Sequence, residues 1–313
     1  MPAPSKAVLI TGCSSGIGRA TALRLAGGGW TVYASARRLE SIADLQEAGA
    51  RTLALDVTDE RSMRAAVRSV EQAEGAVGAL VNNAGYSQSG AIETVPLEAV
   101  RRQFETNVFG LVRLTQLALP KMRAQRWGRI VNVGSMGGRL SFPGAGHYHA
   151  TKHALEAISD AMRFELAGFG IAVTLLEPGL ITTAFGEAAS ASLADAGAPV
   201  DASAPADASA PADPGAPVDA NAPVAASAPA EDPYARFNAT VGAVTKGAYD
   251  GPMRLLGGGP DRVAKVIERT LQSRRPRARI TVTPSAKLAI ATRRLLGDRA
   301  WDAAMRAQFP QPR

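Results

Sequence analysis

The chain has 313 residues, of which 46% are hydrophobic and 20% charged, an ordinary balance for a globular protein with one large α/β domain or two small ones. No apolar run approaches the roughly 20 residues that span a bilayer, so we expect no stable membrane insertion. The net charge is +7, and the single cysteine, Cys13, excludes an internal disulfide and a cysteine-rich metal site. Because Met1 to Ser5 lead at once into a strand-like run, we expect no secretory signal and a cytoplasmic location.

Short β-branched runs alternate with longer helical patterns through the first 180 residues. Near-continuous apolar strands of this kind are typical of a parallel sheet that is covered on both faces. The alternation predicts a single doubly wound, Rossmann-type α/β domain with a mainly parallel sheet of about seven strands. The expected strands are 7–10, 30–34, 52–55, 79–81, 129–133 and 171–176, and the expected helices are 16–26, 39–48, 60–73, 97–123 and 148–168.

A low-complexity segment of Ala, Pro, Asp and Ser occupies residues 187–233. It lacks the apolar side chains that would offset its ordering entropy, so we expect a disordered insertion. We favour a passive loop expansion over a mobile lid, and deletion of residues 190–230 that abolished turnover without unfolding would reverse this preference.

Residues 234–313 predict the far edge of the same sheet rather than a second domain. A helix is expected after Pro260, with Asp261 near its N-cap, and to run to Ser273. A strand over 279–283 and a helix over 285–296 follow.

Basic residues crowd the chain at Arg274, Arg275, Arg277 and Arg279. Such a run suits a nucleic acid, an anionic membrane surface, or simply a solvated face near a helix end. No aromatic residues interleave with these arginines, so we favour the solvated face and expect no nucleic-acid partner.

A glycine-rich turn joins the first strand to the first helix. Residues 11–18 read Thr-Gly-Cys-Ser-Ser-Gly-Ile-Gly, so the glycines Gly12, Gly16 and Gly18 stand where a strand ends and a helix begins. Glycine allows close backbone approach to a pyrophosphate, and a helix N-terminus offers free N–H groups. The turn therefore predicts a dinucleotide site, although a ligand-free βα turn would read the same way. Cys13 has no evident base beside it, so we expect a small packing side chain rather than a nucleophile.

The spacing of this turn resembles that of the classical short-chain dehydrogenases/reductases, most closely their hydroxysteroid and retinol dehydrogenase branch. Further motifs agree in order: Asn82-Asn83-Ala84-Gly85, Asn107, Ser135, Tyr148-xxx-Lys152 and Pro178-Gly179. The resemblance covers residues 6–185, and more loosely 234–296. It implies an oxidoreductase that interconverts a carbonyl and an alcohol by hydride transfer.

Tyr148 and Lys152 stand four residues apart in a helical segment, so their side chains share one face. An ammonium beside a phenol favours the phenolate, so we expect Lys152 to lower the pKa of Tyr148 and make it a general acid/base. By the resemblance, Ser135 holds the substrate oxygen and Asn107 holds a water that links Lys152 to solvent. A tyrosine and a lysine at this spacing are common on ordinary helices, so the prediction depends on the other motifs.

The end of the second strand predicts the choice of nicotinamide. NAD-preferring proteins of this fold place a carboxylate there, but this chain has Ala36 followed by Arg37 and Arg38. A guanidinium grips a ribose phosphate, so we expect NADP(H) to be preferred over NAD(H). A solvated arginine pair is the alternative.

The resemblance assigns further contacts. The expected cofactor-binding residues are Gly12, Ser14, Ser15, Gly16, Ile17, Gly18, Arg37, Arg38, Asp56, Val57, Asn83, Ala84, Gly85, Tyr148, Lys152, Pro178, Gly179, Ile181 and Thr183. Asp56 could instead cap the helix that follows it. The expected substrate-lining residues are Met136, Leu140, Phe142, Pro143, His147 and Phe185.

The substrate class suggested by the resemblance is a lipophilic alcohol or ketone, steroid-like or retinoid-like. A 3-oxoacyl ketoreductase is the alternative enzyme, and a non-catalytic dinucleotide-binding regulator is the alternative outside catalysis. His147 and His149 flank Tyr148, but no third ligand lies in register, so we expect no metal. The resemblance also implies a homodimer or homotetramer formed through the helices that carry Asn107 and Tyr148.

Overall fold

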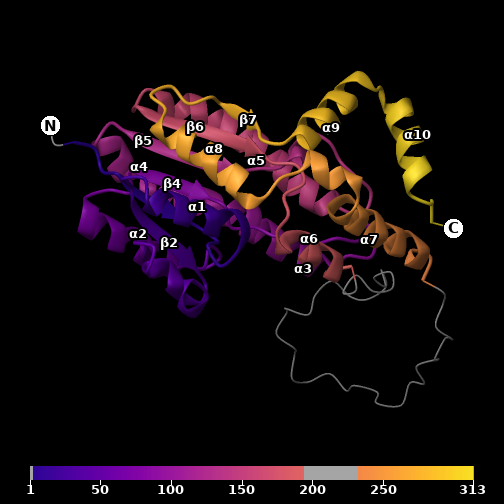
Figure 1. Ribbon diagram of the computed structural model, residues 1–313, viewed down its shortest axis with the longest axis horizontal. Coiled ribbons are helices and arrows are strands. Elements are labelled where there is room, and N and C mark those ends of the chain that lie inside the picture. The colour runs from indigo at the N-terminus through magenta and orange to yellow at the C-terminus, as the bar shows by residue number, and fades with distance from the viewer. Residues whose placement is uncertain (1–2, 194–231, 313) are drawn as a thin grey trace, which may run out of the picture.

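The computed structural model describes residues 3–193 and 232–312. Its centre is a seven-stranded sheet in the order β3-β2-β1-β4-β5-β6-β7, in which every pair is parallel (Figure 1). The strands are β1 (Ala7–Ile10), β2 (Thr31–Ala36), β3 (Arg51–Ala54), β4 (Ala79–Asn82), β5 (Gly128–Val133), β6 (Ile171–Glu177) and β7 (Arg279–Thr281). The predicted α/β fold class and its parallel sheet are confirmed, with small shifts at the strand ends.

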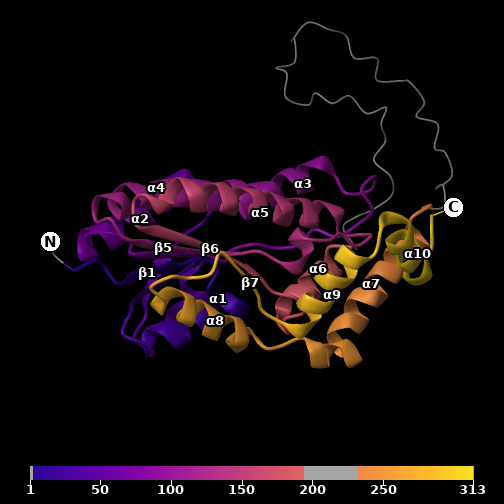
Figure 2. The ribbon, with the colours of Figure 1, turned by 90° about the horizontal axis from the view of Figure 1, so that it is seen from above.

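Helices cover both faces of the sheet (Figure 2). On one face lie α1 (Gly16–Ala26) and α8 (Pro260–Gln272), and on the other α2 (Glu60–Glu74), α3 (Leu97–Phe104), α4 (Gly110–Ala124) and α5 (Gly146–Ala167). Successive residues of β1 point to opposite faces, so Val8 and Ile10 join the core under α1 while Ala7 and Leu9 join the core under α4. None of the described helices is long and apolar enough to cross a membrane.

The strand order reverses between β1 and β4, both of which leave the sheet at the same edge. In open parallel sheets, ligands bind at such a switch point, outside the carboxyl ends of the strands. The glycine-rich turn after β1 and the Asn83–Gly85 segment after β4 meet there.

Two helices differ from the sequence prediction. The expected helix over 97–123 is interrupted by a π-helical segment, Glu105–Phe109, which contains Asn107. The expected helix over 39–48 is a 3₁₀ helix, Leu39–Gln46. Helix α5 begins at Gly146, two residues before Tyr148.

The C-terminal part holds three helices that the sequence did not predict: α6 (Ala184–Ala191), α7 (Ala235–Asp250) and α10 (Asp298–Gln308). The low-complexity segment was expected to be disordered from residue 187, but α6 extends to Ala191, so its first residues are helical. Residues 194–231 of this segment lie outside the described ranges. Together with α9 (Pro284–Leu295) and the 3₁₀ turn η4 (Pro252–Leu256), these helices gather at the end of the molecule that carries the C-terminus (Figure 1).

Caps explain the remaining differences in this part. Pro260 occupies the first turn of α8, so Gly259 is the N-cap and Asp261 lies inside the helix. Strand β7 ends at Thr281 because Thr283 caps α9, accepting from Ala286 N at 3.2 Å.

Candidate active site

The turn after β1 has the backbone shape that its glycines allow. Gly12 has φ +71°, a left-handed conformation that favours glycine. A Cβ at Gly18 would lie 2.3 Å from the Gly12 carbonyl oxygen and 2.5 Å from Asn83 Nδ2. The first turn of α1 therefore packs directly on the loop, and any larger residue at 18 would push them apart.

The segment after β4 fixes this turn. Thr11 Oγ1 accepts from the backbone N–H groups of Asn83 and Ala84, each at 2.9 Å, and the Asn83 amide donates to the carbonyls of Thr11 and Gly12 at 2.9 and 3.1 Å. Asn83 was expected to pass beneath a ribose. The described bonds add a supporting role that the sequence did not reveal.

The amino end of α1 is suited to an anion. Its N-cap, Ser15, makes no side-chain capping bond, and its first turn carries no acidic residue. The hydroxyl-bearing Ser14 and Ser15 are exposed. Uncapped N–H groups and the positive end of the helix dipole fit the pyrophosphate of a dinucleotide.

Arg37 and Arg38 follow β2 as exposed side chains, while Ala36 is buried. Among the residues described, neither guanidinium forms an ion pair. Burial raises the pKa of Tyr86, and the charges of Arg102 and Arg37 oppose that rise, so Arg37 acts across the edge of the sheet on the segment after β4. The pair is thus free to meet a phosphate.

The Asp56 carboxylate holds a local turn. It accepts from the backbone N–H and the hydroxyl of Thr58 at 2.9 and 2.7 Å, whereas Asp59 provides the N-cap of α2. The alternative that Asp56 caps the helix is therefore wrong, because the carboxylate acts one turn earlier. Val57, its predicted partner at the adenine, is buried.

Helix α5 carries Tyr148 and Lys152, both buried, on the face toward the end of β5. Ser135, one residue beyond the Gly134 that follows β5, acts on the pKa of the Tyr148 phenol, and its Oγ accepts from Gly137 N at 3.0 Å. The Lys152 Nζ lies 5.6 Å from the centre of the Tyr148 ring and donates to the Val133 carbonyl at 3.0 Å. The three predicted side chains thus come together at the carboxyl edge of the sheet.

The expected lowering of the Tyr148 pKa does not occur. Burial raises the pKa of Tyr148 well above its ordinary value of 10, the Ser135 hydrogen bond opposes that rise, and the nearby Tyr249 adds to it. Burial also lowers the pKa of Lys152 to about 8. Burial is the largest cause of both shifts because both groups have left water, which disfavours the charged form of each. Tyr148 is therefore a protonated phenol at neutral pH.

Asn107 connects this site to the segment after β4. Its Oδ1 accepts from Tyr86 N at 3.1 Å, and its Nδ2 donates to Tyr86 O at 2.9 Å and to Thr151 Oγ1 at 3.1 Å. Thr151 precedes Lys152, so Asn107 ties the catalytic helix to the loop. The water that we expect at Asn107 stays a prediction.

The Pro178–Thr183 segment closes the edge after β6. The Pro178 carbonyl accepts from Met136 N at 2.8 Å, and Gly179 N donates to Thr283 Oγ1 at 3.1 Å. Ile181 pairs with Gly258, and Thr183 lies against Gly16 of the glycine-rich turn. These contacts bring the segment beside the turn, and its contact with a nicotinamide stays a prediction.

The predicted substrate residues divide into two groups. Phe185 adjoins Tyr148, with ring centres 5.5 Å apart. Phe142 instead packs on His149 and on Trp301 of α10, each at 5.9 Å, and Leu140 is buried. Met136 and His147 are partly buried, and His147 Nε2 has no hydrogen-bond partner among the described residues.

His149 serves packing rather than acid/base chemistry. Its Nδ1 accepts from Phe142 N at 3.1 Å, and burial, with a smaller effect of His153, lowers its pKa to about 4. Cys13 is buried likewise, and burial raises its pKa to about 12. Within the described ranges, no group of side chains has a metal-binding arrangement.

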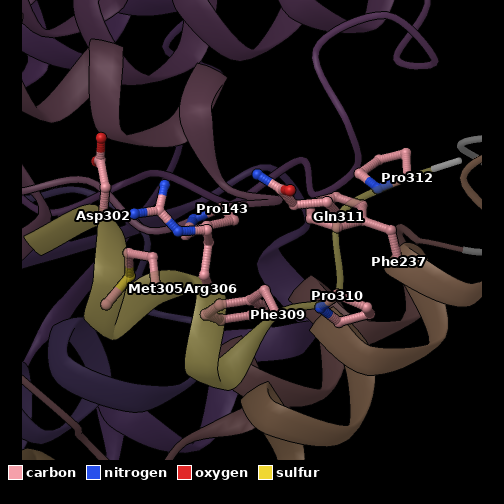
Figure 3. Close-up of a pocket in the computed structure, with 9 residues that line it drawn as sticks. All are labelled: Pro143, Phe237, Asp302, Met305, Arg306, Phe309, Pro310, Gln311 and Pro312. Atoms are coloured by element: carbon pink, nitrogen blue, oxygen red, sulfur yellow. The ribbon is translucent and has the colours of Figure 1, made fainter. Parts of the chain in front are cut away.

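Tyr249 of α7 is a site residue that the sequence did not suggest. Its phenolate, when formed, would raise the pKa of Tyr148, and a Cβ at Gly186 would lie 2.9 Å from its ring. No motif marks it, because it reaches the site from beyond the low-complexity segment. Nearby, Pro143 and Phe237 line a surface hollow of about 240 Å³ beside α10, which Tyr148 and Ser135 do not line (Figure 3).

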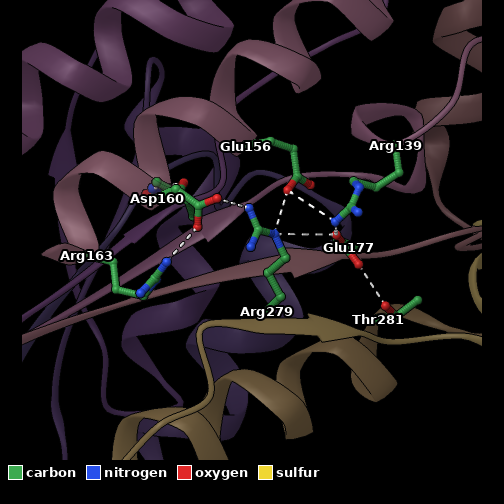
Figure 4. Close-up of polar contacts among 9 residues, drawn as sticks. Arg139, Glu156, Asp160, Arg163, Glu177, Arg279 and Thr281 are labelled. Atoms are coloured by element: carbon green, nitrogen blue, oxygen red, sulfur yellow. Dashed lines mark hydrogen bonds and ion pairs between the residues drawn. The ribbon is translucent and has the colours of Figure 1, made fainter.

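A network of ion pairs joins α5 to β6 and β7 (Figure 4). Arg279 of β7 binds Glu156 at 2.7 Å and also binds Asp160, both on α5. Arg139 bonds Glu177 of β6 at 3.3 Å. The expectation that the arginine run is a solvated face is therefore wrong for Arg279, although Arg274, Arg275 and Arg277 are exposed.

Comparison with known proteins places these features among related enzymes. The family described as short chain dehydrogenase matches residues 6–194. The chain is 40% identical over 179 residues to a 3-ketodihydrosphingosine reductase of Bacteroides thetaiotaomicron, which covers 57% of this chain and 65% of the relative. It is 39% identical over 184 residues to an NADPH-dependent 3-dehydrocapnine reductase of Ornithobacterium rhinotracheale, covering 56% and 65%.

The solved structures extend the likeness to the C-terminal part. A short-chain dehydrogenase from Streptomyces avermitilis superposes with a TM-score of 0.70 at 30% identity and covers 98% of this chain and 99% of its own. By sequence, the chain spans a little under two thirds of the length of the curated relatives that it matches first.

Proposed function

The chain belongs to the short-chain dehydrogenase family, and from that premise we propose that it is a nicotinamide-dependent oxidoreductase that uses NADPH to reduce a ketone on a lipophilic substrate. The observation that carries this proposal is the buried phenol of Tyr148, which lies one helical turn from the buried Lys152, with Lys152 Nζ 5.6 Å from the centre of its ring.

A nicotinamide held by the glycine-rich turn and the Pro178–Thr183 segment would supply the hydride for the carbonyl carbon. Ser135 holds the carbonyl oxygen, and Tyr148 donates its phenolic proton to that oxygen, so hydride and proton together give the alcohol. Burial favours the protonated phenol, which is the form that reduction consumes.

Lys152 supports the phenolate that remains after this transfer. With a pKa of about 8, its amine is mostly charged at neutral pH. Asn107 positions the helix through Thr151, and we propose that it also holds the water through which Tyr148 regains a proton.

The cofactor preference rests on Arg37. An arginine pair without a described ion-pair partner, next to a buried alanine where a carboxylate would favour NAD, supports NADPH over NADH. The relative named as an NADPH-dependent reductase points in the same direction.

The substrate class is supported by the aromatic surroundings of Tyr148 and by the relatives' names. Phe185 lies beside the phenol, and Tyr249 acts on it from α7. Two relatives are named as reductases of a 3-keto or 3-dehydro compound. We therefore favour a hydrophobic 3-ketone over the steroid-like or retinoid-like substrate.

The test is a panel followed at the nicotinamide absorbance. It contains 3-ketodihydrosphingosine, a 3-oxoacyl thioester, a ketosteroid and a small water-soluble ketone, each with NADPH. We expect turnover to be fastest with the long-chain 3-ketone. Tight NADPH binding without turnover of any ketone, or of any alcohol with NADP⁺, would instead indicate a non-catalytic regulator.

We also propose that two or four copies associate through α4 and α5. The large apolar side chains of Phe164 on α5 and of Phe109 beside α4 are 85% and 53% exposed. Sedimentation of the wild type and of Phe164→Glu tests this, because a monomeric wild type would contradict it.

A further inference from the structure

A second cleft lies at the amino ends of the strands, away from the active site. It has a volume of about 520 Å³ and lies beside the N-terminal segment, which marks the opposite end of the molecule from the C-terminal helices (Figure 1). Its lining residues are Ala3, Pro4, Lys6, Gly28, Gly29, Trp30, Trp127, Arg129, Leu271, Gln272, Ser273 and Arg274.

The charges that line this cleft are all positive. Lys6, Arg129 and Arg274 contribute to it, no carboxylate does, and none of the three forms an ion pair with a described residue. One carboxylate, that of Glu268, comes within 3.4 Å of a Cβ built at Gly28, and it is bound by Arg24 at 3.2 Å.

Arg129 is the central cation. Its side chain is only 8% exposed, with Nη1 donating to the Gly128 carbonyl at 2.9 Å and Nη2 to the Ser273 carbonyl at 3.2 Å. Its Nε is buried without a partner among the described residues. Burial lowers the pKa of Arg129 without an opposing carboxylate. A buried guanidinium of this kind is unfavourable until an anion accompanies it.

Two tryptophans form the apolar wall. Trp30 and Trp127 stack with ring centres 6.4 Å apart and planes 25° from parallel, and the Arg129 guanidinium lies 5.0 Å from the Trp127 ring centre. A Cβ at Gly29, another lining residue, would meet nothing within 4 Å, so the space beside it is open. Indole faces offer stacking area to a flat ring.

We propose that this cleft binds an organic anion with a flat aromatic body, its ring against Trp30 and Trp127 and its carboxylate on Arg129. The site is separate from the catalytic one. Arg129 stands near the start of β5 and Ser135 beyond its end, about 20 Å away at 3.3 Å per residue. The proposal does not depend on the proposed reaction.

The test is calorimetric titration of the full chain with 2-naphthoate, in the presence of saturating NADPH. The neutral analogue 2-naphthalenemethanol has the same ring without the charge. We expect naphthoate to bind and the neutral analogue to bind at least tenfold more weakly. Arg129→Met should weaken naphthoate at least tenfold, about 1.4 kcal/mol, because it removes the buried charge while keeping side-chain volume.

Arg275→Met is the matched control, since Arg275 is exposed on the same segment but does not line the cleft. It should leave the affinity unchanged. If Arg129→Met unfolds, Arg274→Met at the exposed rim replaces it and should weaken binding by a smaller factor. Equal affinities of wild type and either cleft variant for naphthoate would overturn the proposal. Sedimentation would also overturn it if the wild type were a dimer and Arg129→Met a monomer, because a second copy of the chain would then fill the cleft.

Discussion

Two regions meet near Tyr148 but are held in different ways. The first, here called the nucleotide half, is the glycine-rich turn after β1 with the segment after β4; the second, here called the cover, consists of α6 and α7. The nucleotide half is fixed by backbone geometry: the Thr11–Gly12 turn, the Asn83 amide and the uncapped start of α1. The cover is held by side chains, with Phe185 and Tyr249 packed near Tyr148. The difference teaches that a site shaped by backbone leaves a motif, whereas one shaped by packing does not.

The largest effect on cofactor binding should follow a change in the backbone-built half. Gly18→Ala places a Cβ 2.3 Å from the Gly12 carbonyl and should weaken NADPH binding by more than about 100-fold, because the turn and the helix must separate. Fluorescence titration with NADPH measures it. Gly27→Ala is the matched control, since a Cβ there meets nothing within 4 Å. Equal affinities for the two variants would show that the turn is not the phosphate site.

Arg37→Ala should sharpen the comparison within the same half. Loss of a charge-assisted contact to a phosphate should weaken NADPH binding about 10-fold to 100-fold and leave NADH binding unchanged. Separate titrations of the two cofactors measure this, with Arg38→Ala expected to have the smaller effect. Equal losses for NADPH and NADH would contradict the assignment.

The fold and most of the nucleotide half could be predicted from the sequence, because the fold depends on hydrophobic periodicity and the nucleotide half on glycine spacing. The sequence could not give the π segment at Asn107, since a single extra residue in a helical turn leaves no clear pattern. It also missed the sign of the Tyr148 pKa shift. The four-residue spacing indicates that Lys152 is near Tyr148. The direction of the pKa shift is set by burial, however, and burial depends on the folded chain.

Helix α5 carries Lys152, and the pH dependence of ketone reduction should show whether the charge of this lysine matters. Burial lowers the pKa of Lys152 to about 8, so its ammonium is present below that pH and is lost above it. Without the ammonium, the phenolate left by proton transfer is less stable. We expect kcat/KM for ketone reduction to be level below pH 8 and to fall up to tenfold per pH unit above it. A profile that stays level to pH 10 would exclude this role for Lys152.

The smallest effect is expected in the cover. Tyr249→Phe removes only a hydroxyl, so we expect KM for the ketone to rise several-fold with kcat and NADPH affinity nearly unchanged. Steady-state kinetics measures the split. Tyr234→Phe is the matched control, because Tyr234 is the N-cap of the same helix and its hydroxyl bonds Glu93 rather than facing Tyr148. A loss in kcat as large as that of a proton donor would place Tyr249 in the chemistry instead.

Tyr148→Phe tests the central claim most directly, because it deletes the proton donor and keeps the ring that packs against Phe185. Single-turnover reduction of the best ketone by the NADPH-loaded variant is the measurement, with circular dichroism and NADPH affinity as controls for folding. We predict a rate lower by about 10² to 10⁴ with unchanged NADPH affinity. A folded variant that reduces the ketone at the wild-type rate would contradict the account.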